Sequence, residues 1–256
     1  MQLKYITCSD PRDFNDIYKI IDLTQISPRV EIAVQMHPSK VSPGTPRYEW
    51  FGKLVDYVDL MHGFERYNVN LAVHVNEQYC EEICRTGKIP AELKPFFEKY
   101  YDSEKKHPIV KRWQLNMSKA AVRDINYDAV QKLFADNPKN EFILQYNDRT
   151  EQVAWTLYEM GTKFSLLYDA SGGRGIAPGS WNRPVYDVVP MGYSGGLSPE
   201  NVVENLKKIS SVVPKHREDI WIDAEGKLKT DDKFDVELAA NYILAAEKWL
   251  QNQKIR

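Results

Sequence analysis

Residues 187–211, DVVPMGYSGGLSPENVVENLKKISS, contain one complete strand–turn–helix unit. The apolar and β-branched run 187–194 predicts a strand, and helical spacing begins after Ser198. Ser198 is a good N-cap residue, and Pro199 suits the first position of a helix. A Gly-Gly pair joins the two elements and leaves the backbone bare at the turn. The fold depends on how often the chain repeats this unit.

The same alternation of a short apolar run and a longer helical segment recurs along the whole chain. The predicted strands are 3–8, 30–36, 70–76, 110–116, 141–147, 164–170, 187–194 and 219–225. Helices are predicted at 11–24, 47–62, 118–136, 149–160, 199–211 and 235–252. Such alternation is typical of parallel strands, and eight units favour a closed barrel over a doubly wound open sheet. We therefore predict the α/β class and a single (β/α)8 TIM barrel over residues 1–256.

The third unit is longer than the others. Between its strand and the next strand, the chain carries the insertion IPAELKPFFEKYYDSEKKHP, residues 89–108. Two short helices would fit in this segment, and its aromatic side chains could cover one end of the barrel. We predict an extended third βα unit and no second domain.

Composition narrows the class of protein and of partner. The 256 residues are 43% hydrophobic and 12% aromatic, which is enough for a sizeable core. A net charge of -2 without any Lys/Arg-rich block gives no reason to expect a nucleic-acid partner. No apolar stretch has the length of a membrane span, and the start MQLKYITCSDPRDF is not a signal peptide. We expect a cytoplasmic protein with no membrane partner.

The three cysteines and five histidines predict neither disulfides nor a metal site. An odd number of cysteines does not suit a disulfide framework. Cys80 and Cys84 are one helical turn apart, but no histidine or further cysteine pair accompanies them at zinc-ligand spacing. His74 alternates with apolar strand residues, which is typical of a packed side chain.

In a barrel of this kind the active site lies where the strands end and their loops begin. Polar residues close nearly every predicted strand, although loops often start with polar residues in any case. The residues selected by this position are Cys8, Asn76, Asn116, Asn147, Asp169, Ser194 with the following glycines, and 223–226.

Two of these residues have side chains suited to proton transfer. Cys8 closes the first strand, where a cysteine is either a small buried hydrophobic residue or, if the thiolate is favoured, a base. Asp169 closes the sixth strand in LLYDASGGRG, either as a carboxylate held at a site or as a loop cap. Gly172, Gly173 and Arg174 give the loop that follows flexibility and positive charge.

Two further segments are suited to binding an anion. Arg47, in SPGTPRYEWF, stands at a predicted helix start and could hold a carboxylate or phosphate, or could be solvated. Gly195 and Gly196 precede a helix N-terminus, where unpaired N–H groups attract anions. The same glycines also suit a tight turn that binds no ligand.

Six motifs follow one another along nearly the whole chain: KYITCS, TPRYEW, AVHVNE, RWQLNM, LLYDASGGRG with a following SW, and GYSGGLSPENV. Taken together and in this order, they resemble the phosphoribosylanthranilate isomerase family of tryptophan biosynthesis. Only the last motif is specific by itself, and the order of the set carries the resemblance. The pattern at the eighth strand is kept only in part, as WIDAEGKL.

The resemblance implies an intramolecular oxidoreductase of the aldose–ketose type, an isomerase without metal or organic cofactor. The family carries out an Amadori rearrangement, which turns an N-linked aminoaldose phosphate into an aminoketose. This reaction needs an acid to open the sugar ring and a base to move a proton from the adjacent carbon. The implied partner is a sugar-phosphate-like small molecule, and the oligomeric state stays open. The implied roles are base for Cys8, acid for Asp169, substrate binding for Arg47, Asn116, Gly172, Gly173 and Arg174, and phosphate binding for Gly195, Gly196 and Gly226.

Four positions depart from the family pattern. Ser9 replaces a glycine, Asn116 replaces a histidine, and Ala224 and Glu225 stand where the family has two serines at the phosphate site. A carboxylate repels phosphate, so we expect Glu225 to point away from the anion site. The departures keep two alternatives open: the same barrel acting on another sugar or an unphosphorylated molecule, and a barrel that binds a small molecule without turnover.

Overall fold

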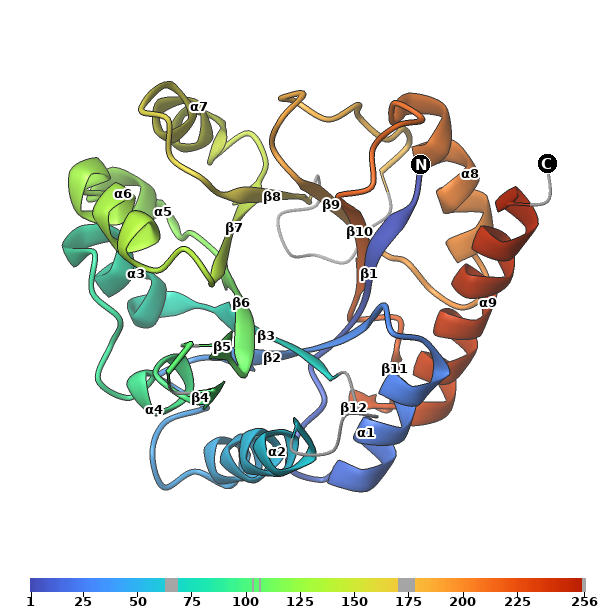
Figure 1. Ribbon diagram of the computed structural model, residues 1–256, viewed down its shortest axis with the longest axis horizontal. Coiled ribbons are helices and arrows are strands. Elements are labelled where there is room, and N and C mark those ends of the chain that lie inside the picture. Colours follow the sequence, from blue (N-terminus) through green and yellow to red (C-terminus); the bar gives the residue numbers. More distant parts are fainter. Residues whose placement is uncertain (63–68, 103, 106, 170–177, 255–256) are drawn as a thin grey trace.

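The protein is a closed barrel of eight parallel strands surrounded by helices (Figure 1). The computed structural model describes residues 1–62, 69–102, 104–105, 107–169 and 178–254. The barrel strands follow one another in the order β1-β10-β9-β8-β7-β6-β3-β2. Their bounds are β1 Leu3–Ser9, β2 Val30–Met36, β3 Asn70–Val75, β6 Val110–Leu115, β7 Glu141–Tyr146, β8 Ser165–Tyr168, β9 Met191–Ser194 and β10 Ile220–Ala224. The predicted (β/α)8 barrel is confirmed.

The helices form the outer ring, and their ends follow the capping side chains. They are α1 Ile17–Ile26, α2 Pro46–His62, α3 Glu77–Thr86, α4 Lys94–Phe97, α5 Lys119–Arg123, α6 Tyr127–Asp136, α7 Glu151–Glu159, α8 Val202–Val212 and α9 Val236–Lys254. The helix predicted at 11–24 starts later, because Asp16 accepts a hydrogen bond from the Tyr18 N–H and caps it. The helix predicted at 118–136 is divided, because Ser118 caps α5 and Asn126 caps α6. Within the described residues, no helix has both the length and the apolar character needed to cross a membrane.

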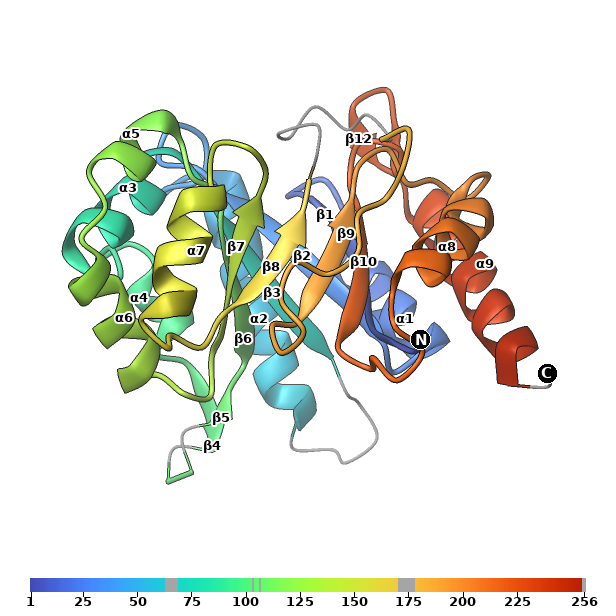
Figure 2. The same ribbon diagram turned by 90° about the horizontal axis from the view of Figure 1, so that it is seen from above.

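The third unit is extended, as predicted, but it contains one short helix and a hairpin instead of two short helices. After α3 come α4 and the antiparallel strands β4 Tyr100–Asp102 and β5 His107–Pro108. Phe96 packs on Phe51 and Phe97 on Trp113, with ring centroids 4.7 and 5.0 Å apart. A second hairpin, β11 Lys229–Thr230 with β12 Lys233–Phe234, precedes α9. Figure 2 shows the two hairpins at opposite ends of the barrel.

Alternation along the strands decides which side chains enter the barrel. On β1, Ile6 and Cys8 belong to the main hydrophobic core cluster, whereas Thr7 and Ser9 hydrogen-bond to interior carboxylates of other strands. Tyr5 packs against a separate small cluster that contains Trp221. Successive residues of a strand point to opposite faces, so Tyr5, Thr7 and Ser9 share the inner face.

A buried ion cluster fills the barrel interior toward the amino ends of the strands, here called the lower layer. The Arg112 guanidinium donates to Glu31 at 2.7 Å and to Glu141 at 3.3 Å. It lies between the rings of Tyr5 and Trp221, at 4.4 and 4.2 Å from their centroids, where both ring faces attract the cation. These side chains fill the interior at that end. The space left for a ligand is at the carboxyl ends of the strands, here called the upper layer.

Candidate active site

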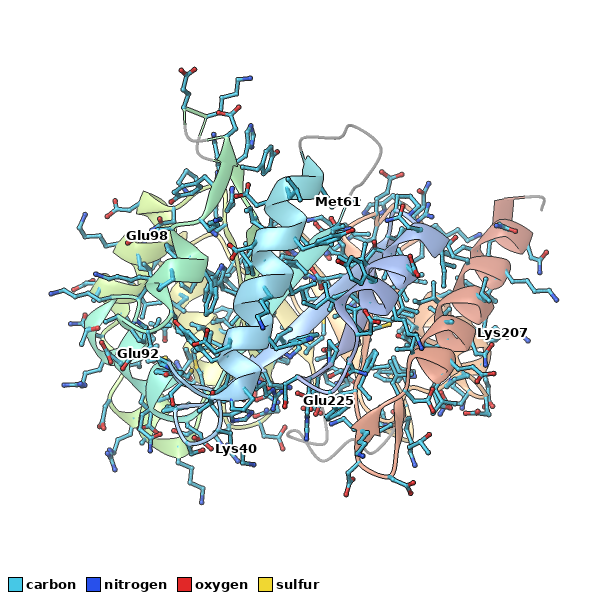
Figure 3. All side chains as sticks on the ribbon, turned by 90° about the horizontal axis from the view of Figure 1, so that it is seen from below. Lys40, Met61, Glu92, Glu98, Lys207 and Glu225 are labelled. Carbon is cyan, nitrogen blue, oxygen red and sulfur yellow. The ribbon has the colours of Figure 1, made fainter. Side chains whose placement is uncertain are left out.

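A pocket of about 610 Å³ opens at the carboxyl ends of the barrel strands. This volume suits a small-molecule ligand. Figure 3 shows Glu225 and Lys40, which both line the pocket, at the end of the molecule opposite to Met61. All eight barrel strands or the loops directly after them contribute to the lining, through Asp10, Gln35, His74, Gln114, Gln145, Leu167, Ser194 and Asp223.

Three buried carboxylates line this pocket: Asp10 directly after β1, Asp169 directly after β8 and Asp223 on β10. Gln145 donates to Asp169 Oδ2 at 2.7 Å, and Ser9 Oγ donates to Asp223 Oδ1 at 2.6 Å. Burial raises the pKa of Asp223 to about 7; the Ser9 hydrogen bond lowers it, and the charges of Glu225 and Asp169 raise it. Asp223 can therefore gain or lose a proton near neutral pH.

Cys8 lies outside the pocket. Its side chain is fully buried in the core cluster between barrel and helices, and within the described chain it is not among the residues lining the pocket. Burial raises the pKa of the Cys8 thiol well above its usual value, and the charges of Asp223 and Glu31 raise it further. This position does not fit the role of base that the family resemblance implies for Cys8, because alternation along β1 turns Ser9 inward and Cys8 outward.

Arg47 lines the pocket, as expected, but it already holds a carboxylate of the protein. Its guanidinium is paired with Asp10, which directly follows β1 and has a left-handed φ of 74°. Asp10 also accepts from Arg12 at 2.5 Å and from Lys229 at 2.9 Å. Burial lowers the pKa of Arg47 to about 10, against the nearby charge of Glu225. Three cations from separate segments thus converge on one buried carboxylate at the pocket edge.

The glycine turn after β9 faces the pocket. Gly195 and Gly196 have φ values of 128° and 59°, which favour glycine, and both line the pocket together with Gly226. The helix α8 was expected to start at 199; its regular part begins at Val202, whose N–H donates to the Ser198 carbonyl at 2.9 Å. Backbone without side chains therefore lies at the pocket wall, directly before the first turn of α8.

Glu225 points toward the pocket, contrary to expectation. Its carboxylate accepts from Gln35 Nε2 at 2.9 Å and from Lys229 Nζ at 3.2 Å, and its side chain is 43% exposed. The neighbours that hold it are Gln35 on β2, 190 residues earlier, and Lys229 on β11, four residues later. The Lys229 ammonium offsets part of its charge.

Asn116 lies in the pocket, as predicted, within a row of side-chain amides. Gln35, Asn76, Gln114 and Gln145 line the pocket beside it. The predicted substrate-binding residues Gly172, Gly173 and Arg174 lie outside the described residues.

Sequence reasoning missed Gln35, Gln114 and Gln145, although a signal was present. Each is a polar residue inside an otherwise apolar strand, in VEIAVQM, VKRWQL and EFILQY. Polar residues at alternate positions of a buried strand mark the face that lines a polar interior.

His74 is a neutral, packed side chain. Burial lowers the pKa of its imidazole to about 4, although Glu225 and Glu31 raise it. Its Nε2 atom lies 3.9 Å from Asp223 Oδ2, and its Nδ1 atom lies 3.5 Å from Gln35 Nε2. Within the described part of the chain, no group of three or more His, Cys, Asp or Glu residues could hold a metal ion.

Comparisons with known proteins add no reaction to this site. No family model matches the chain, and no curated protein matches it. Among solved structures, N-(5'-phosphoribosyl)anthranilate isomerase from Pyrococcus furiosus is 12% identical, with a TM-score of 0.47, and the match covers 95% of this chain and 98% of that one. 3-Hexulose-6-phosphate synthase from Salmonella typhimurium is 9% identical, with a TM-score of 0.46, and the match covers 94% of this chain and 98% of that one. 3-Keto-L-gulonate-6-phosphate decarboxylase from Vibrio cholerae is 15% identical, with a TM-score of 0.46, and the match covers 97% of this chain and 99% of that one.

The strand pairing alone defines the chain as a TIM-barrel protein, and its pocket defines a polar small-molecule site. Likenesses this distant say nothing about the substrate. The chemistry must be argued from the pocket itself.

Proposed function

We propose that this barrel is an aldose–ketose-type isomerase acting on a small, sugar-phosphate-like substrate. The observation that carries the proposal is the pair of buried carboxylates, Asp169 and Asp223, in one pocket, with the pKa of Asp223 near 7. Isomerisation of this type moves one proton between adjacent carbons and needs one group to accept it and one to donate. A carboxylate that titrates near neutral pH is suited to this exchange.

In this proposal Asp169 keeps the role of the acid, and Asp223 replaces Cys8 as the base. Asp169 donates a proton to the ring oxygen of an N-linked aminoaldose, so the ring carbon–oxygen bond breaks and an open-chain iminium forms. Asp223 then removes the proton from the neighbouring carbon, and the electron pair of that bond neutralises the iminium nitrogen to give an enolamine. The enolamine tautomerises to the aminoketose. The hydrogen bond from Ser9 orients the Asp223 carboxylate for the proton transfer.

The phosphate is proposed to bind at the backbone of Gly195, Gly196 and Gly226. Two features support this: the glycine turn before α8 places backbone without side chains at the pocket wall, and Lys229 offsets the charge of Glu225. Arg47 and Asn116, both in the pocket lining, are proposed to bind the rest of the substrate, together with Gly172, Gly173 and Arg174.

The proposed chemistry is tested by hydrogen exchange. Purified protein is incubated in D2O with a panel of aldose phosphates and N-linked aminoaldose phosphates, and deuterium at the carbon next to the carbonyl or imine is followed by NMR. Asp169→Asn and Asp223→Asn should each lower exchange by roughly 100-fold or more, the usual size of general acid–base effects. Asp136→Asn, the same change at an exposed residue of α6, is the matched control. Near-normal exchange in either pocket variant would overturn the assignment of that residue.

Whether the substrate is phosphoribosylanthranilate itself is tested separately by growth. The gene is introduced into a host that lacks its own isomerase, and growth is followed on medium without tryptophan. Growth that is lost with Asp169→Asn supports this particular substrate, and no growth with a well-expressed protein rejects it.

The direction of Glu225 favours one alternative, an unphosphorylated substrate. A charge pair at about 4 Å and an effective dielectric near 20 costs about 4 kcal/mol, enough to abolish ordinary phosphate affinity. Titration of inorganic phosphate into wild type and Glu225→Ser separates the two cases. Binding to both proteins supports a phosphorylated substrate, whereas binding to Glu225→Ser alone supports the unphosphorylated one.

A further inference from the structure

Four side-chain amides and one carboxylate form a continuous hydrogen-bonded chain across the pocket wall. Gln114 Nε2 donates to Asn116 Oδ1 at 2.8 Å, and Asn116 Nδ2 donates to Asn76 Oδ1 at 2.9 Å. Asn76 Nδ2 donates to Gln35 Oε1 at 2.7 Å, and Gln35 Nε2 donates to Glu225 Oε2 at 2.9 Å. These five residues, here called the amide chain, come from the ends of β6, β3, β2 and β10, and all of them line the pocket.

Glu225 and a backbone carbonyl together fix the direction of the bonds in the amide chain. An ionised carboxylate only accepts, so Gln35 must present its NH₂ group to Glu225 and its oxygen to Asn76. Asn76 is held the same way round by the backbone carbonyl of His74, to which its Nδ2 donates at 2.9 Å. Lys229 holds Glu225 in place from the other side. Each amide therefore has one orientation, and the bonds polarise one another along the chain.

The amide chain leaves hydrogen-bonding capacity for a ligand. A carboxamide has two N–H donors and two oxygen lone pairs. At Asn116 one donor and one lone pair serve the chain. At Asn76 the N–H groups donate to Gln35 and to the His74 carbonyl, and one oxygen lone pair serves the chain. Among the described residues that line the pocket, the apolar side chains are Met117, Leu167 and Leu197. An aryl group placed on this wall would remove the amides from water without replacing their hydrogen bonds, which is unfavourable. Hydroxyl groups both donate and accept hydrogen bonds, so they would pair with the amide groups of the pocket wall.

We propose that the amide chain binds the hydroxyl groups of an open-chain sugar or polyol part of the substrate, in preference to an aromatic group. Glu225 and the His74 carbonyl together set the donor and acceptor pattern of the wall. The inference rests on the proposed function only for placing a phosphorylated substrate in this pocket, and it narrows that substrate to a hydroxyl-rich one.

Binding of three phosphorylated probes tests the inference by calorimetry. D-ribitol 5-phosphate carries hydroxyls, phenyl phosphate carries an aryl group, and inorganic phosphate carries neither. Ribitol phosphate has no carbonyl and cannot isomerise, so its binding is independent of turnover, and failure of the hydrogen-exchange test leaves this result standing. We expect ribitol phosphate to bind at least about tenfold more tightly than phenyl phosphate, the effect of one or two hydrogen bonds.

Asn116→Leu keeps the size of the side chain but interrupts the amide chain. It should weaken ribitol phosphate about tenfold while inorganic phosphate is unchanged, the effect of roughly one hydrogen bond. Gln152→Leu, a matched change at an exposed residue of α7, should change neither. A purely structural role would move both affinities together. If Asn116→Leu does not fold, Gln114→Met at the end of the chain repeats the test.

Three results would overturn the inference. They are phenyl phosphate binding as tightly as ribitol phosphate, no binding of ribitol phosphate to wild type, and an unchanged ratio of affinities in the chain variants.

Discussion

Asp223→Asn should make the protein more stable, and the gain should grow with pH. In the unfolded chain the carboxyl ionises near its ordinary pKa of 3.8, whereas in the fold burial raises its pKa to about 7. The folded protein therefore binds the proton more tightly, and the contribution of this group to stability is lost as the pH rises toward 7. An asparagine carries no such charge, so the variant does not lose this stability.

The size of the effect follows from the two pKa values. A difference from 3.8 to about 7 corresponds to about 4 kcal/mol in the free energy of unfolding. The gap between variant and wild type should open by about 1.4 kcal/mol per pH unit between pH 4 and pH 7, and stay constant above pH 7. Asn can still accept the hydrogen bond from Ser9, so little contact energy is lost at low pH.

Urea denaturation of both proteins from pH 4 to pH 8.5 measures this gap. Ser9→Ala is the companion variant, because it removes the hydrogen bond that lowers the pKa of Asp223. The free energy of unfolding of Ser9→Ala is then compared with that of the double variant Ser9→Ala/Asp223→Asn. The difference between these two proteins should keep growing to a higher pH than the difference between wild type and Asp223→Asn. A gap between Asp223→Asn and wild type that does not change with pH would refute the raised pKa, and with it the reason for choosing Asp223 as the base.

Two further substitutions test the ion cluster in the barrel interior and the hydrophobic core that contains Cys8. Arg112→Met should destabilise the protein by about 3–5 kcal/mol in urea denaturation, because it leaves the buried Glu31 carboxyl without its cation. Adding Glu31→Gln should recover part of the loss, and a single variant as stable as wild type would contradict the role of the ion cluster. Cys8→Ala should leave turnover within about twofold, because the thiol packs in the core, and a thiol reagent should not label Cys8 in the native protein. A 100-fold loss of turnover in Cys8→Ala with an unchanged melting temperature would instead restore it as a site residue, since that is the scale of acid–base catalysis.

The strand–helix order of the barrel could be predicted because each element carries its own local signal. The strand predicted at 30–36 is β2 Val30–Met36, and the other barrel strands end within a few residues of their predicted ends. Hairpins β4–β5 and β11–β12 were not predicted, because strands of two or three residues are too short for a periodic pattern.

The direction of Cys8 could also have been predicted from its own strand. In LKYITCS the more polar residues Tyr5, Thr7 and Ser9 alternate with Ile6 and Cys8, and in this barrel the polar face points inward. A shift of one residue turns a side chain to the opposite face of the sheet. The family resemblance pointed to Cys8, whereas the alternation pointed to Ser9, and the alternation is correct.

Other features of the pocket depend on contacts that no local pattern contains. Glu225 is turned inward by Gln35, which lies 190 residues earlier, and Arg47 is paired with Asp10, which lies 37 residues earlier. The direction of a long, charged side chain depends on which partners the fold brings within reach. A single sequence does not show these partners.

The two layers of the barrel interior treat buried charge in opposite ways, and this contrast is the strongest argument for chemistry at the pocket. In the lower layer, Arg112 is paired with Glu31 and Glu141. In the upper layer, Asp223 is buried beside two more carboxylates, and the charges of those neighbours raise its pKa. An interior selected for stability alone would replace Asp223 by a neutral residue, because its ionised form lowers the free energy of unfolding near neutral pH. Buried carboxylates with raised pKa values are common at sites where the proton itself is used, but buried ion pairs shift pKa values too, and burial also raises the pKa of Glu31 in the lower layer. What distinguishes Asp223 is that it combines a raised pKa with a place in the pocket lining, and this supports the proton transfer proposed above.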